Sequence, residues 1–401
     1  MKILYVYTSR LPTEKAHGYQ VMKMCEAFAA AGNDVLLLCP RRKNSKETKT
    51  ASGIFDFYAV RKIFGIKKIF TIDLSPWPIF QAIWFRLHMA VYSASVCCWM
   101  LMHRREFDLI YSRDPFTLHA LKFFRKRIGT RLAYECHDFP RRHIRSRIAL
   151  ANQIDAVITV TGKIKERFVD ARVKGEKILV APDAVDLAQF DLPLTRADAR
   201  MKLRLASGMR MATFVGRFHT MEMEKGIPDI IRAAAELIPD FSDLFFYFIG
   251  GPLDRESRYR QIVEDLGLPQ DRFVFLDQQP VRDVPIWLKA SDALLMPFPN
   301  EPHFAFFMSP LKMFEYMASK RPIVASKLSV IMEILRHEEN ALLGAPGDAA
   351  GIAANIKEIL DNPALSEKVS SKAYDDVRVH TWDKRGKRIL IFICENREGP
   401  I

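Results

Sequence analysis

Short apolar runs typical of buried strands alternate with helical segments along the whole chain, and this alternation limits the possible folds. In the first half we expect strands at Lys2–Tyr7, Asp34–Cys39, Asp108–Tyr111, Arg131–Glu135, Ala156–Val160 and Ile178–Ala181. In the second half we expect them at Met211–Val215, Leu244–Ile249, Phe273–Leu276, Ala293–Met296 and Ile323–Ala325. Strands joined by helices form parallel sheets with crossover connections. The sequence therefore predicts an α/β protein with two doubly wound, Rossmann-like sheets, which bind ligands at the carboxyl ends of their strands.

The length and the apolar content of the chain fit two domains. The 401 residues exceed one average domain, and the 49% of hydrophobic residues supply material for two cores. A polar stretch begins at Pro182–Asp186, after the last strand of the first half, so we place the boundary there. The predicted domains are residues 1–185 and 186–378. Residues 379–401 contain a helix, Trp382–Cys394, that we expect to pack back on the first domain.

Positive charge is concentrated in the N-terminal half. The chain has 60 Lys and Arg against 47 Asp and Glu, and residues 1–190 hold 32 of the basic and 17 of the acidic residues. We therefore expect an anionic partner for this half, such as a membrane surface, a phosphorylated acceptor or nucleic acid. A basic face without a dedicated partner stays open as an alternative. Because the sequence contains no zinc-ligand pattern and no recognisable nucleic-acid-binding motif, we expect no nucleic acid partner.

A segment rich in aromatic residues and methionine, residues 76–103, is the candidate for membrane contact. Arg86 interrupts it, and the uncharged run Met89–Met102 is shorter than the roughly 20 residues of a transmembrane helix. Lys67-Lys68 and Arg104-Arg105 flank the segment. An interfacial helix on anionic lipid and a buried core helix both fit this pattern.

The cysteines and the N-terminus indicate a cytoplasmic protein. The six cysteines show no metal-ligand spacing, which is typical of reduced thiols. The first ten residues fit a first strand and lack the layout of a signal peptide. We expect a cytoplasmic protein that is peripheral on the inner face of the cell membrane.

Two cations follow the first strand of the second half. The strand ends at Val215, Gly216 permits a sharp turn, and Arg217 then lies at the carboxyl edge of the sheet. Lys225 follows before the next helix. Arg and Lys at such an edge can hold a diphosphate and stabilise the charge that develops on a departing one. Two surface cations beside a turn are the alternative.

The segment Ser309–Ser326, SPLKMFEYMASKRPIVAS, predicts a helix that opens at Ser309-Pro310, followed by a strand. Free backbone N–H groups at the helix start, around Pro310-Leu311, can bind a phosphate. Glu315 lies one turn later among apolar residues, where a carboxylate needs a polar partner. An ordinary amphipathic helix with a solvent-facing Glu is the alternative.

Two weaker signals lie at strand ends of the first half. Gly18 begins a helix after the first strand, and its amide can approach a phosphate. His137 follows a strand in YECHDF, where it can donate a hydrogen bond or move a proton, oriented by Glu135 or Asp138. A structural histidine is the commoner alternative.

Two further turns complete the set of candidates. Gly251 ends a strand in FIGGP, and Gln279-Pro280 follows the next strand, where backbone groups can pair with a base edge. A plain turn is the more ordinary interpretation of both. The sequence contains no metal-ligand pattern, so we expect no metal and no cofactor.

Taken together, these segments resemble the family 4 glycosyltransferases. The pieces that carry the resemblance are AHGYQ, YECHDF, VAPDAVD, FVGRF followed by EKG, FIGGP and SPLKMFEYMASKRPIVAS. They occur in the order of the family and cover nearly the full length. The resemblance implies the GT-B fold, with two Rossmann-like domains facing a central cleft, and a retaining, metal-independent transferase that uses a nucleotide-diphosphate sugar.

The resemblance also implies residue roles. Arg217 and Lys225 would hold the donor diphosphate and act in catalysis, and Glu315 would accept from the ribose hydroxyls. The backbone around Pro310 would meet a phosphate or the sugar, and Lys312 would contribute there. His137 matches the histidine near the donor sugar. The first domain would bind the acceptor, Gly18 would face the phosphates, and the second domain would bind the nucleotide sugar.

Three departures from the family pattern matter. The family usually has two Glu residues eight positions apart, but the first of these positions is Phe307, which affects sugar recognition. The usual Pro-Asn-Gly-Val turn is Pro182-Asp183-Ala184-Val185. No carboxylate is an obvious nucleophile, so we expect a same-face mechanism in which the leaving diphosphate helps to deprotonate the acceptor.

The leading hypothesis is a hexosyltransferase-type enzyme that moves a sugar to a lipid-linked or polysaccharide acceptor at the cytoplasmic membrane face, in cell-envelope polysaccharide biosynthesis. A sugar-nucleotide epimerase or hydrolase with the same fold is the second hypothesis. A sugar-nucleotide binding protein without catalysis, prompted by Phe307, is the third.

Overall fold

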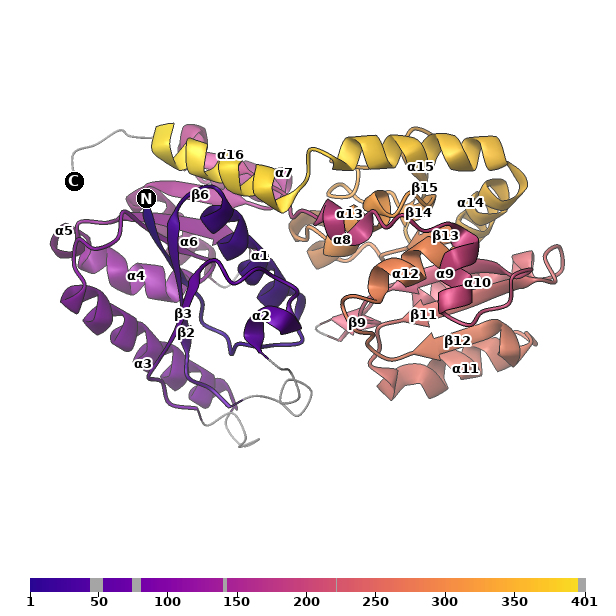
Figure 1. Cartoon of the computed structure of the whole chain (residues 1–401), viewed down its shortest axis with the longest axis horizontal. Coiled ribbons are helices and arrows are strands. Elements are labelled where there is room, and N and C mark those ends of the chain that lie inside the picture. Colours follow the sequence, from indigo (N-terminus) through magenta and orange to yellow (C-terminus); the bar gives the residue numbers. More distant parts are fainter. Residues whose placement is uncertain (44–52, 74–80, 140–142, 221, 396–401) are drawn as a thin grey trace. The chain divides into compact units, whose positions relative to one another are not determined.

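The computed structural model describes residues 1–43, 53–73, 81–139, 143–220 and 222–395 (Figure 1). The chain divides into two compact α/β units. The N-terminal unit consists of Met1–Asp183 and Trp382–Ile401, and the C-terminal unit of Ala184–Thr381. The sequence predicts these borders at residues 185/186 and 378/379.

The N-terminal unit contains a seven-stranded sheet in the order β3-β2-β1-β4-β5-β6-β7, and all its pairs are parallel. Its strands are β1 Lys2–Val6, β2 Asp34–Pro40, β3 Gly65–Ile69, β4 Leu109–Ser112, β5 Arg131–Cys136, β6 Ala156–Thr159 and β7 Ile178–Val180. Its helices are α1 Ala16–Ala30, α2 Ile54–Phe57, α3 Gln81–Met102, α4 Pro115–Phe123, α5 Arg125–Ile128, α6 Ile144–Gln153, α7 Gly162–Asp170 and α16 Trp382–Glu395. The Thr161 side chain caps α7, as a Thr before a helix predicts.

The C-terminal unit contains a six-stranded parallel sheet in the order β12-β11-β8-β13-β14-β15. Its strands are β8 Arg210–Val215, β11 Leu244–Ile249, β12 Phe273–Leu276, β13 Ala293–Met296, β14 Ile323–Ser326 and β15 Leu342–Gly344, and a short hairpin pairs β9 His219–Thr220 with β10 Met223–Glu224. Its helices are α8 Leu187–Phe190, α9 Arg196–Lys202, α10 Ile227–Leu237, α11 Glu256–Asp265, α12 Val284–Ala290, α13 Leu311–Ala318, α14 Ala349–Asp361 and α15 Pro363–Val377.

The prediction of two parallel Rossmann-like sheets is confirmed, although four strands were missed. β3 was missed because Lys67 and Lys68 interrupt its apolar pattern at the sheet edge, where one side needs no burial. β15 is only three residues long, and the hairpin strands only two each. Such short segments carry too few residues for a periodic signal.

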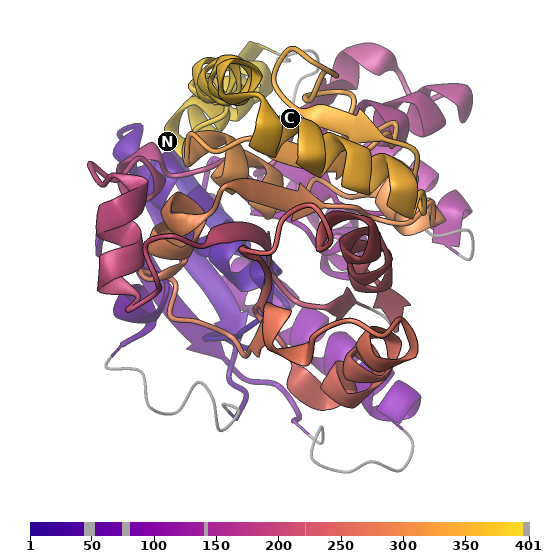
Figure 2. The same cartoon turned by 90° about the vertical axis from the view of Figure 1, so that its right-hand side faces the viewer.

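Each face of the C-terminal sheet carries its own hydrophobic core, and helices flank the strands on both sides (Figure 2). One core includes Phe214 and Phe248 under α10 and α14, and the other includes Tyr316 and Met317 of α13. The strands are therefore buried on both faces, which explains their continuous apolar sequences. Polar side chains can gather only at the two ends of the strands.

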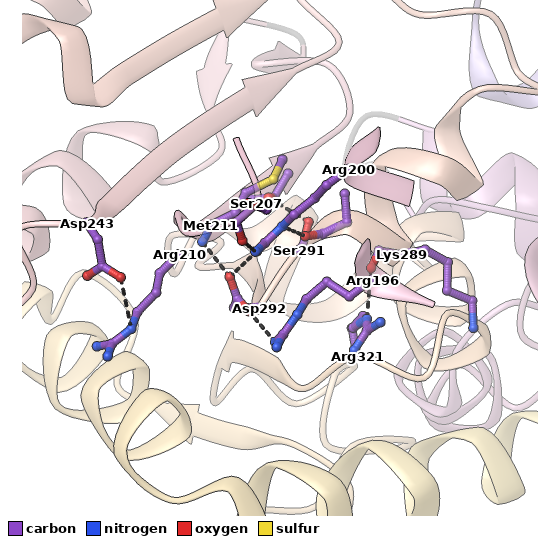
Figure 3. Close-up of polar contacts among 12 residues, drawn as sticks. Arg196, Arg200, Ser207, Arg210, Met211, Asp243, Lys289, Ser291, Asp292 and Arg321 are labelled. Atoms are coloured by element: carbon purple, nitrogen blue, oxygen red, sulfur yellow. Dashed lines mark hydrogen bonds and ion pairs between the residues drawn. The ribbon is translucent and has the colours of Figure 1, made fainter. Parts of the chain in front are cut away.

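The amino-terminal edge of the C-terminal sheet is fixed by Asp292. Its carboxylate accepts from the backbone N–H of Met211 (2.6 Å) and from Nη2 of Arg200 (2.5 Å), and it also pairs with Arg196 (Figure 3). Asp292 and Arg200 are both buried. These bonds tie α9 to the starts of β8 and β13, because a buried charge has to be paired to be stable.

The long helix α3 packs one face on the N-terminal sheet and leaves the other exposed. The Tyr92 hydroxyl donates to the carbonyls of Tyr7 (2.9 Å) and Leu38 (3.1 Å), and the His88 ring bonds to the Thr71 hydroxyl (2.7 Å). In the described residues α3 is the one helix long and apolar enough to cross a membrane, but these bonds anchor it to the sheet. The interpretation of α3 as a buried core helix is therefore correct for one face only, because side chains on its other face are exposed.

Helix α16 belongs to the N-terminal unit and packs against α1. Gly386 faces Ala27, where an added Cβ would lie 3.0 Å from the Ala27 Cβ, and the Trp382 ring meets Tyr19 edge-on. The return of the last helix to the first unit was expected from its basic and apolar sequence.

Candidate functional site

At the carboxyl edge of the C-terminal sheet, the turn after β8 bonds to the end of β11 and to the turn that follows it. The N–H of Gly216 donates to Ile249 O (2.7 Å), and the N–H of Phe218 donates to Gly251 O (2.7 Å). Gly216 has φ +126° and Gly250 has φ +128°, and a Cβ on Gly250 would lie 2.7 Å from the Gly216 carbonyl. Because only glycine allows this approach, the turns after β8 and β11 can lie directly against each other.

Lys312 of α13 lies beneath the first of these turns. Its Nζ is 3.5 Å from the centre of the Phe214 ring and would be 2.9 Å from a Cβ at Gly216. The residue is 9% exposed, and among the described residues its Nζ has no hydrogen-bond partner. A buried ammonium without a partner is unfavourable, and an aromatic face compensates only part of the lost hydration. Lys312 is therefore placed to meet a ligand anion.

Lys225 and Arg217 add two further cations at this edge. Burial and the neighbouring Arg217 lower the pKa of Lys225 to about 8. Burial and the Lys225 ammonium lower the pKa of Lys312 well below its usual value, against the opposing effect of Glu315. Arg217 therefore acts on Lys225, and Lys225 acts on Lys312, so each of these cations lies close enough to the next to interact with it. We call Arg217, Lys225 and Lys312 the cation cluster.

Glu315 is the acidic group next to the cation cluster. Burial raises the pKa of its carboxyl to about 7, although Lys312 opposes this. The Tyr316 hydroxyl accepts from the N–H of Val215 (2.7 Å) and so fixes α13 to the end of β8. The sequence prediction that Arg217, Lys225 and Glu315 come together is consistent with this geometry.

Gly226 sets the position of Lys225. It has φ +87°, and a Cβ on it would lie 1.9 Å from the carbonyl oxygen of Pro297. This contact brings the start of α10 against the turn that follows β13. Any other residue would push Lys225 away from the site.

The start of α13 provides backbone donors. The helix begins at Leu311, Pro310 is its N-cap, and no side chain caps it. The N–H of Met313 donates to Pro310 O (3.0 Å), whereas the amides of Leu311 and Lys312 have no acceptor among the described residues. Such amides favour an anion. Ser309 lies just outside the helix and is half-buried.

Three other donor-site candidates, Gly251, Gln279 and Pro280, lie in turns where each has a structural role. A Cβ on Gly251, which has φ +49°, would lie 2.2 Å from Asp277 Oδ1, so glycine is required by packing. The Gln279 side chain donates to Asp277 O (3.0 Å), and Pro280 O accepts from the Asp283 N–H (2.9 Å) before α12. Pro280 lacks an N–H and its carbonyl is engaged, so the turn interpretation fits it and its predicted base contact stays untested.

The prediction for Gly18 is wrong in its main point. The helix begins at Ala16, two residues earlier than expected, and the N–H of Gly18 donates to Lys15 O (2.9 Å). A Cβ on Gly18 would lie 2.5 Å from Thr13 and 2.5 Å from the Tyr58 hydroxyl. The glycine is required for packing, and its amide is not free to meet a phosphate.

His137 lies in a network centred on Glu135 in the N-terminal unit. Glu135 is fully buried, and its Oε1 accepts from His137 Nε2 (2.8 Å), Gln20 Nε2 (2.7 Å) and Arg385 Nη2 (2.7 Å). Its Oε2 accepts from the Tyr111 hydroxyl (2.6 Å). Glu135 therefore orients His137, whereas Asp138 turns away to Arg147 (2.5 Å). Of the two acids proposed as orienting groups, Glu135 is correct.

Charge compensation determines the protonation of this network. Burial raises the pKa of Glu135, but the Arg385 guanidinium and the hydrogen bond from His137 outweigh it and hold the pKa well below its usual value. Burial and Arg113 lower the pKa of His137, although Glu135 opposes them. A neutral His137 that gives Nε2–H to Glu135 keeps Nδ1 as a potential acceptor. The tautomer is inferred from this hydrogen bond.

The residues Glu135, His137 and Asp183 lie close enough to hold a metal, since their ligand atoms are within 4.8 Å of one another. They fit a metal poorly. The Glu135 oxygen already accepts three hydrogen bonds, and Arg385 supplies its positive charge at 2.7 Å. A divalent ion would have to displace a buried guanidinium.

Sequence reasoning missed several members of the His137 network. Arg113 Nη1 donates to Gln20 Oε1 (2.7 Å), and Arg385 also donates to Pro182 O (2.7 Å). These residues come from α1, α16 and the β4–α4 turn, far apart in sequence. The one available signal was the basic residue Arg385 on the apolar side of the last helix.

Comparison with known proteins agrees with this layout. The family model "Glycosyltransferase Family 4" matches residues 18–189, and the model "Glycosyl transferases group 1" matches residues 210–362. The chain belongs to the family 4 glycosyltransferases. Together the two matches cover most of this family 4 chain, one in each unit.

Individual curated relatives share limited sequence identity with this chain. One is the 2-deoxystreptamine glucosyltransferase of Streptomyces kanamyceticus, 30% identical over 50% of this chain and 51% of that protein. Another is the lipopolysaccharide core biosynthesis glycosyltransferase LpsD of Rhizobium meliloti, 28% identical over 48% and 50%. The matches therefore span about half the length of these curated relatives.

The fold is that of the GT-B glycosyltransferases. The crystal structure of HepE of Anabaena in complex with UDP and glucose superimposes with a TM-score of 0.72 at 20% identity, over 98% of this chain and 99% of HepE. At this identity the likeness shows the fold alone.

Proposed function

We propose that this family 4 chain transfers a sugar from a nucleotide-diphosphate sugar to a lipid-linked or polysaccharide acceptor, with retention of anomeric configuration and without a bound metal. The observation that carries the proposal is the cation cluster. Its three members have no hydrogen-bonded counter-anion among the described residues, and the Lys312 ammonium is buried. A diphosphate supplies the missing negative charge.

The cation cluster also suits the chemistry of the leaving group. Negative charge builds up on the diphosphate as the bond to the sugar breaks, and fixed cations stabilise that charge without reorganisation. The free amides at the start of α13 add donors for a phosphate oxygen. A cationic site of this kind performs the role that a metal ion plays elsewhere, which supports the metal-independent reaction.

We assign Glu315 as the acceptor of hydrogen bonds from the ribose hydroxyls of the donor. Its carboxyl has a pKa raised to about 7 by burial, so hydroxyl donors from a ligand would favour its ionised form. His137, held by Glu135, is assigned to the donor sugar. No residue is assigned as a covalent nucleophile, and the departing diphosphate is assigned as the base for the acceptor hydroxyl.

The identity of the substrates rests on relatives. HepE was crystallised with UDP and UDP-glucose, and LpsD acts in lipopolysaccharide core biosynthesis. We therefore propose UDP-sugars as the first donors to test, and cell-envelope glycans at the cytoplasmic membrane face as the acceptors.

The donor assignment is tested by thermal unfolding with a panel of nucleoside diphosphates and their sugars. A true donor at about 100 times its dissociation constant adds about 2.7 kcal/mol of stability. We expect one nucleotide series to raise the unfolding temperature of the wild type and to leave an Arg217→Ala, Lys225→Ala double variant unchanged. Equal shifts in both proteins would contradict the diphosphate role.

The reaction is tested by NMR of the anomeric proton after incubation with the donor and membrane glycan extracts. Retention with no sugar adduct on the protein is the expected result, and a trapped adduct on Glu or Asp would contradict the same-face mechanism. Conversion of the donor without acceptor would favour the epimerase or hydrolase hypothesis.

A non-catalytic binding protein is the second candidate, and Phe307 favours it. The family usually places an acid there, whereas here an aromatic side chain occupies the π-helical turn His303–Phe307. Saturable donor binding without product from any extract would support this candidate.

A further inference from the structure

An apolar face on the N-terminal unit lacks a partner among the described residues. Helix α3 exposes Ile83 (55%), Phe85 (58%) and Met102 (73%), and the neighbouring helix α4 exposes Phe116 (53%) and Phe123 (79%). Helices α3 and α4 pack side by side (Figure 1). Large apolar side chains gathered in this way mark an interaction surface. We call this surface the α3–α4 face.

A groove runs along the α3–α4 face. Its volume is about 570 Å³, and its walls are mainly apolar, with Phe85, Met89 and Leu101 on one side and Phe116 and Phe124 on the other. Arg86 and Ser93 supply the polar side chains of the lining. An apolar groove with a single cation in its lining suits a hydrocarbon chain better than a polar ligand.

The charges around the α3–α4 face are positive. The sequences of α3, α4 and α5 contain no Asp or Glu. Lys126 and Arg127 on α5 are exposed, and α5 packs against both α3 and α4. The Lys122 ammonium lies over the Phe123 ring at 5.2 Å, so its charge remains at the edge of the apolar surface. This combination is complementary to anionic headgroups above acyl chains.

We propose that the α3–α4 face binds the surface of an anionic phospholipid bilayer, with its apolar side chains and groove in contact with acyl chains and its cations in contact with phosphates. Helix α3 lies in the interface and does not cross it, because on its other face Tyr92 bonds to Leu38 of β2 and His88 bonds to Thr71 just after β3. The proposal rests on the proposed function only for the location of the acceptor.

A second copy of the chain is a less favourable occupant. Self-association through this face would bring Arg86, Lys126 and Arg127 of two copies close together. Like charges at an interface oppose association. An anionic bilayer satisfies both the apolar groove and the cations.

The proposal is tested by co-sedimentation of the full-length protein with vesicles, without donor or acceptor, so that failure here is distinguishable from failure of sugar transfer. Vesicles of phosphatidylcholine with phosphatidylglycerol are compared with phosphatidylcholine alone. We expect binding to the anionic vesicles, and a loss of affinity of about tenfold or more in Phe123→Glu, because a large apolar side chain no longer enters the acyl layer. Met201→Glu is the matched control, since Met201 is 72% exposed on α9 in the other unit.

A second pair of variants separates charge from apolar contact. Lys126→Glu with Arg127→Glu should reduce binding to anionic vesicles, whereas Lys202→Glu with Arg258→Glu, the same charge change on exposed residues of the C-terminal unit, should reduce it less. Equal losses in the two pairs would indicate attraction by net charge only and would overturn the proposal.

Cys98 provides an attachment point for a probe that detects lipid in the groove. It lies in the lining and is the exposed one of the six free cysteines. An environment-sensitive fluorophore on Cys98, in a Cys394→Ser background, should shift to shorter wavelength with anionic vesicles and be quenched by spin-labelled acyl chains. An unchanged spectrum, or a concentration-dependent dimer abolished by Phe123→Glu, would overturn the proposal and assign the face to a protein partner.

Discussion

The central residue of the site is Lys312, whose ammonium is buried with no hydrogen-bond partner among the described residues. Such a group lowers stability in the free protein and becomes favourable only when an anion meets it. Its contact with the Phe214 ring keeps it in place until then. A residue selected for folding alone would be apolar at this position.

Replacing this lysine separates stability from ligand affinity. Lys312→Met keeps the volume and removes the charge. We expect the free protein to be as stable as the wild type or more so, while the affinity for the best nucleoside diphosphate falls by about tenfold or more, equivalent to about 1.4 kcal/mol. Urea unfolding and titration calorimetry measure the two effects. The control Lys327→Met changes an exposed lysine and should alter neither, and a destabilised variant with native affinity would contradict the assignment.

Diphosphate affinity should depend on pH through Lys225. Its pKa is lowered to about 8, so the ammonium is charged below that pH and neutral above it. Affinity should therefore fall as the pH rises through about 8. Lys225→Arg should flatten this dependence, because a guanidinium stays charged there. Identical pH profiles of the two proteins, measured by calorimetry, would exclude Lys225 from the binding site.

The positions of site residues could be predicted where the signal is local, whereas their roles stay predictions. Arg217, Lys225 and Glu315 follow strand ends or helix starts within one short segment each, so their meeting at one sheet edge follows from the α/β pattern. The network of Glu135 could not be predicted, because it joins residues up to 250 positions apart. Gly18 was misassigned because an amide at a helix start is free only if no nearby carbonyl accepts it.

At the scale of elements, the turns that carry the cations depend on glycine. Gly226→Ala places a Cβ 1.9 Å from Pro297 O at a positive φ. We expect it to lower the free energy of unfolding by about 2 kcal/mol or more and to weaken diphosphate binding, because Lys225 moves with the turn. Gly208→Ala is the matched control, since nothing lies within 4 Å of an added Cβ there. Equal unfolding curves for both variants would show that the turn tolerates displacement.

Helix α16 carries the counter-charge of the His137 network. Arg385→Ala leaves the fully buried Glu135 without its cation, and breaking such a pair costs about 3–5 kcal/mol. Arg388→Ala on the same helix changes an exposed residue and should stay within about 0.5 kcal/mol of the wild type. The midpoint of urea unfolding measures both, and a small effect of Arg385→Ala would mean that Glu135 is protonated or hydrated.

At the scale of the whole molecule, the α/β alternation predicted both parallel sheets because buried parallel strands are continuous apolar runs. It missed the edge strand β3, where two lysines interrupt the apolar pattern, and β15, which is too short for a periodic signal. It left α3 open between a core helix and an interfacial helix. The structure shows why both patterns were present, since one face is bonded to the sheet and the other is exposed.

The central claim is that a diphosphate-linked donor binds over Arg217, Lys225 and Lys312 at the start of α13. A crystal structure with the nucleoside diphosphate that stabilises the protein most tests it directly. We expect phosphate oxygens within hydrogen-bond distance of these cations and of the Leu311 amide, with the ribose hydroxyls bonded to Glu315. A diphosphate bound elsewhere, with the Lys312 ammonium still unpartnered, would contradict it.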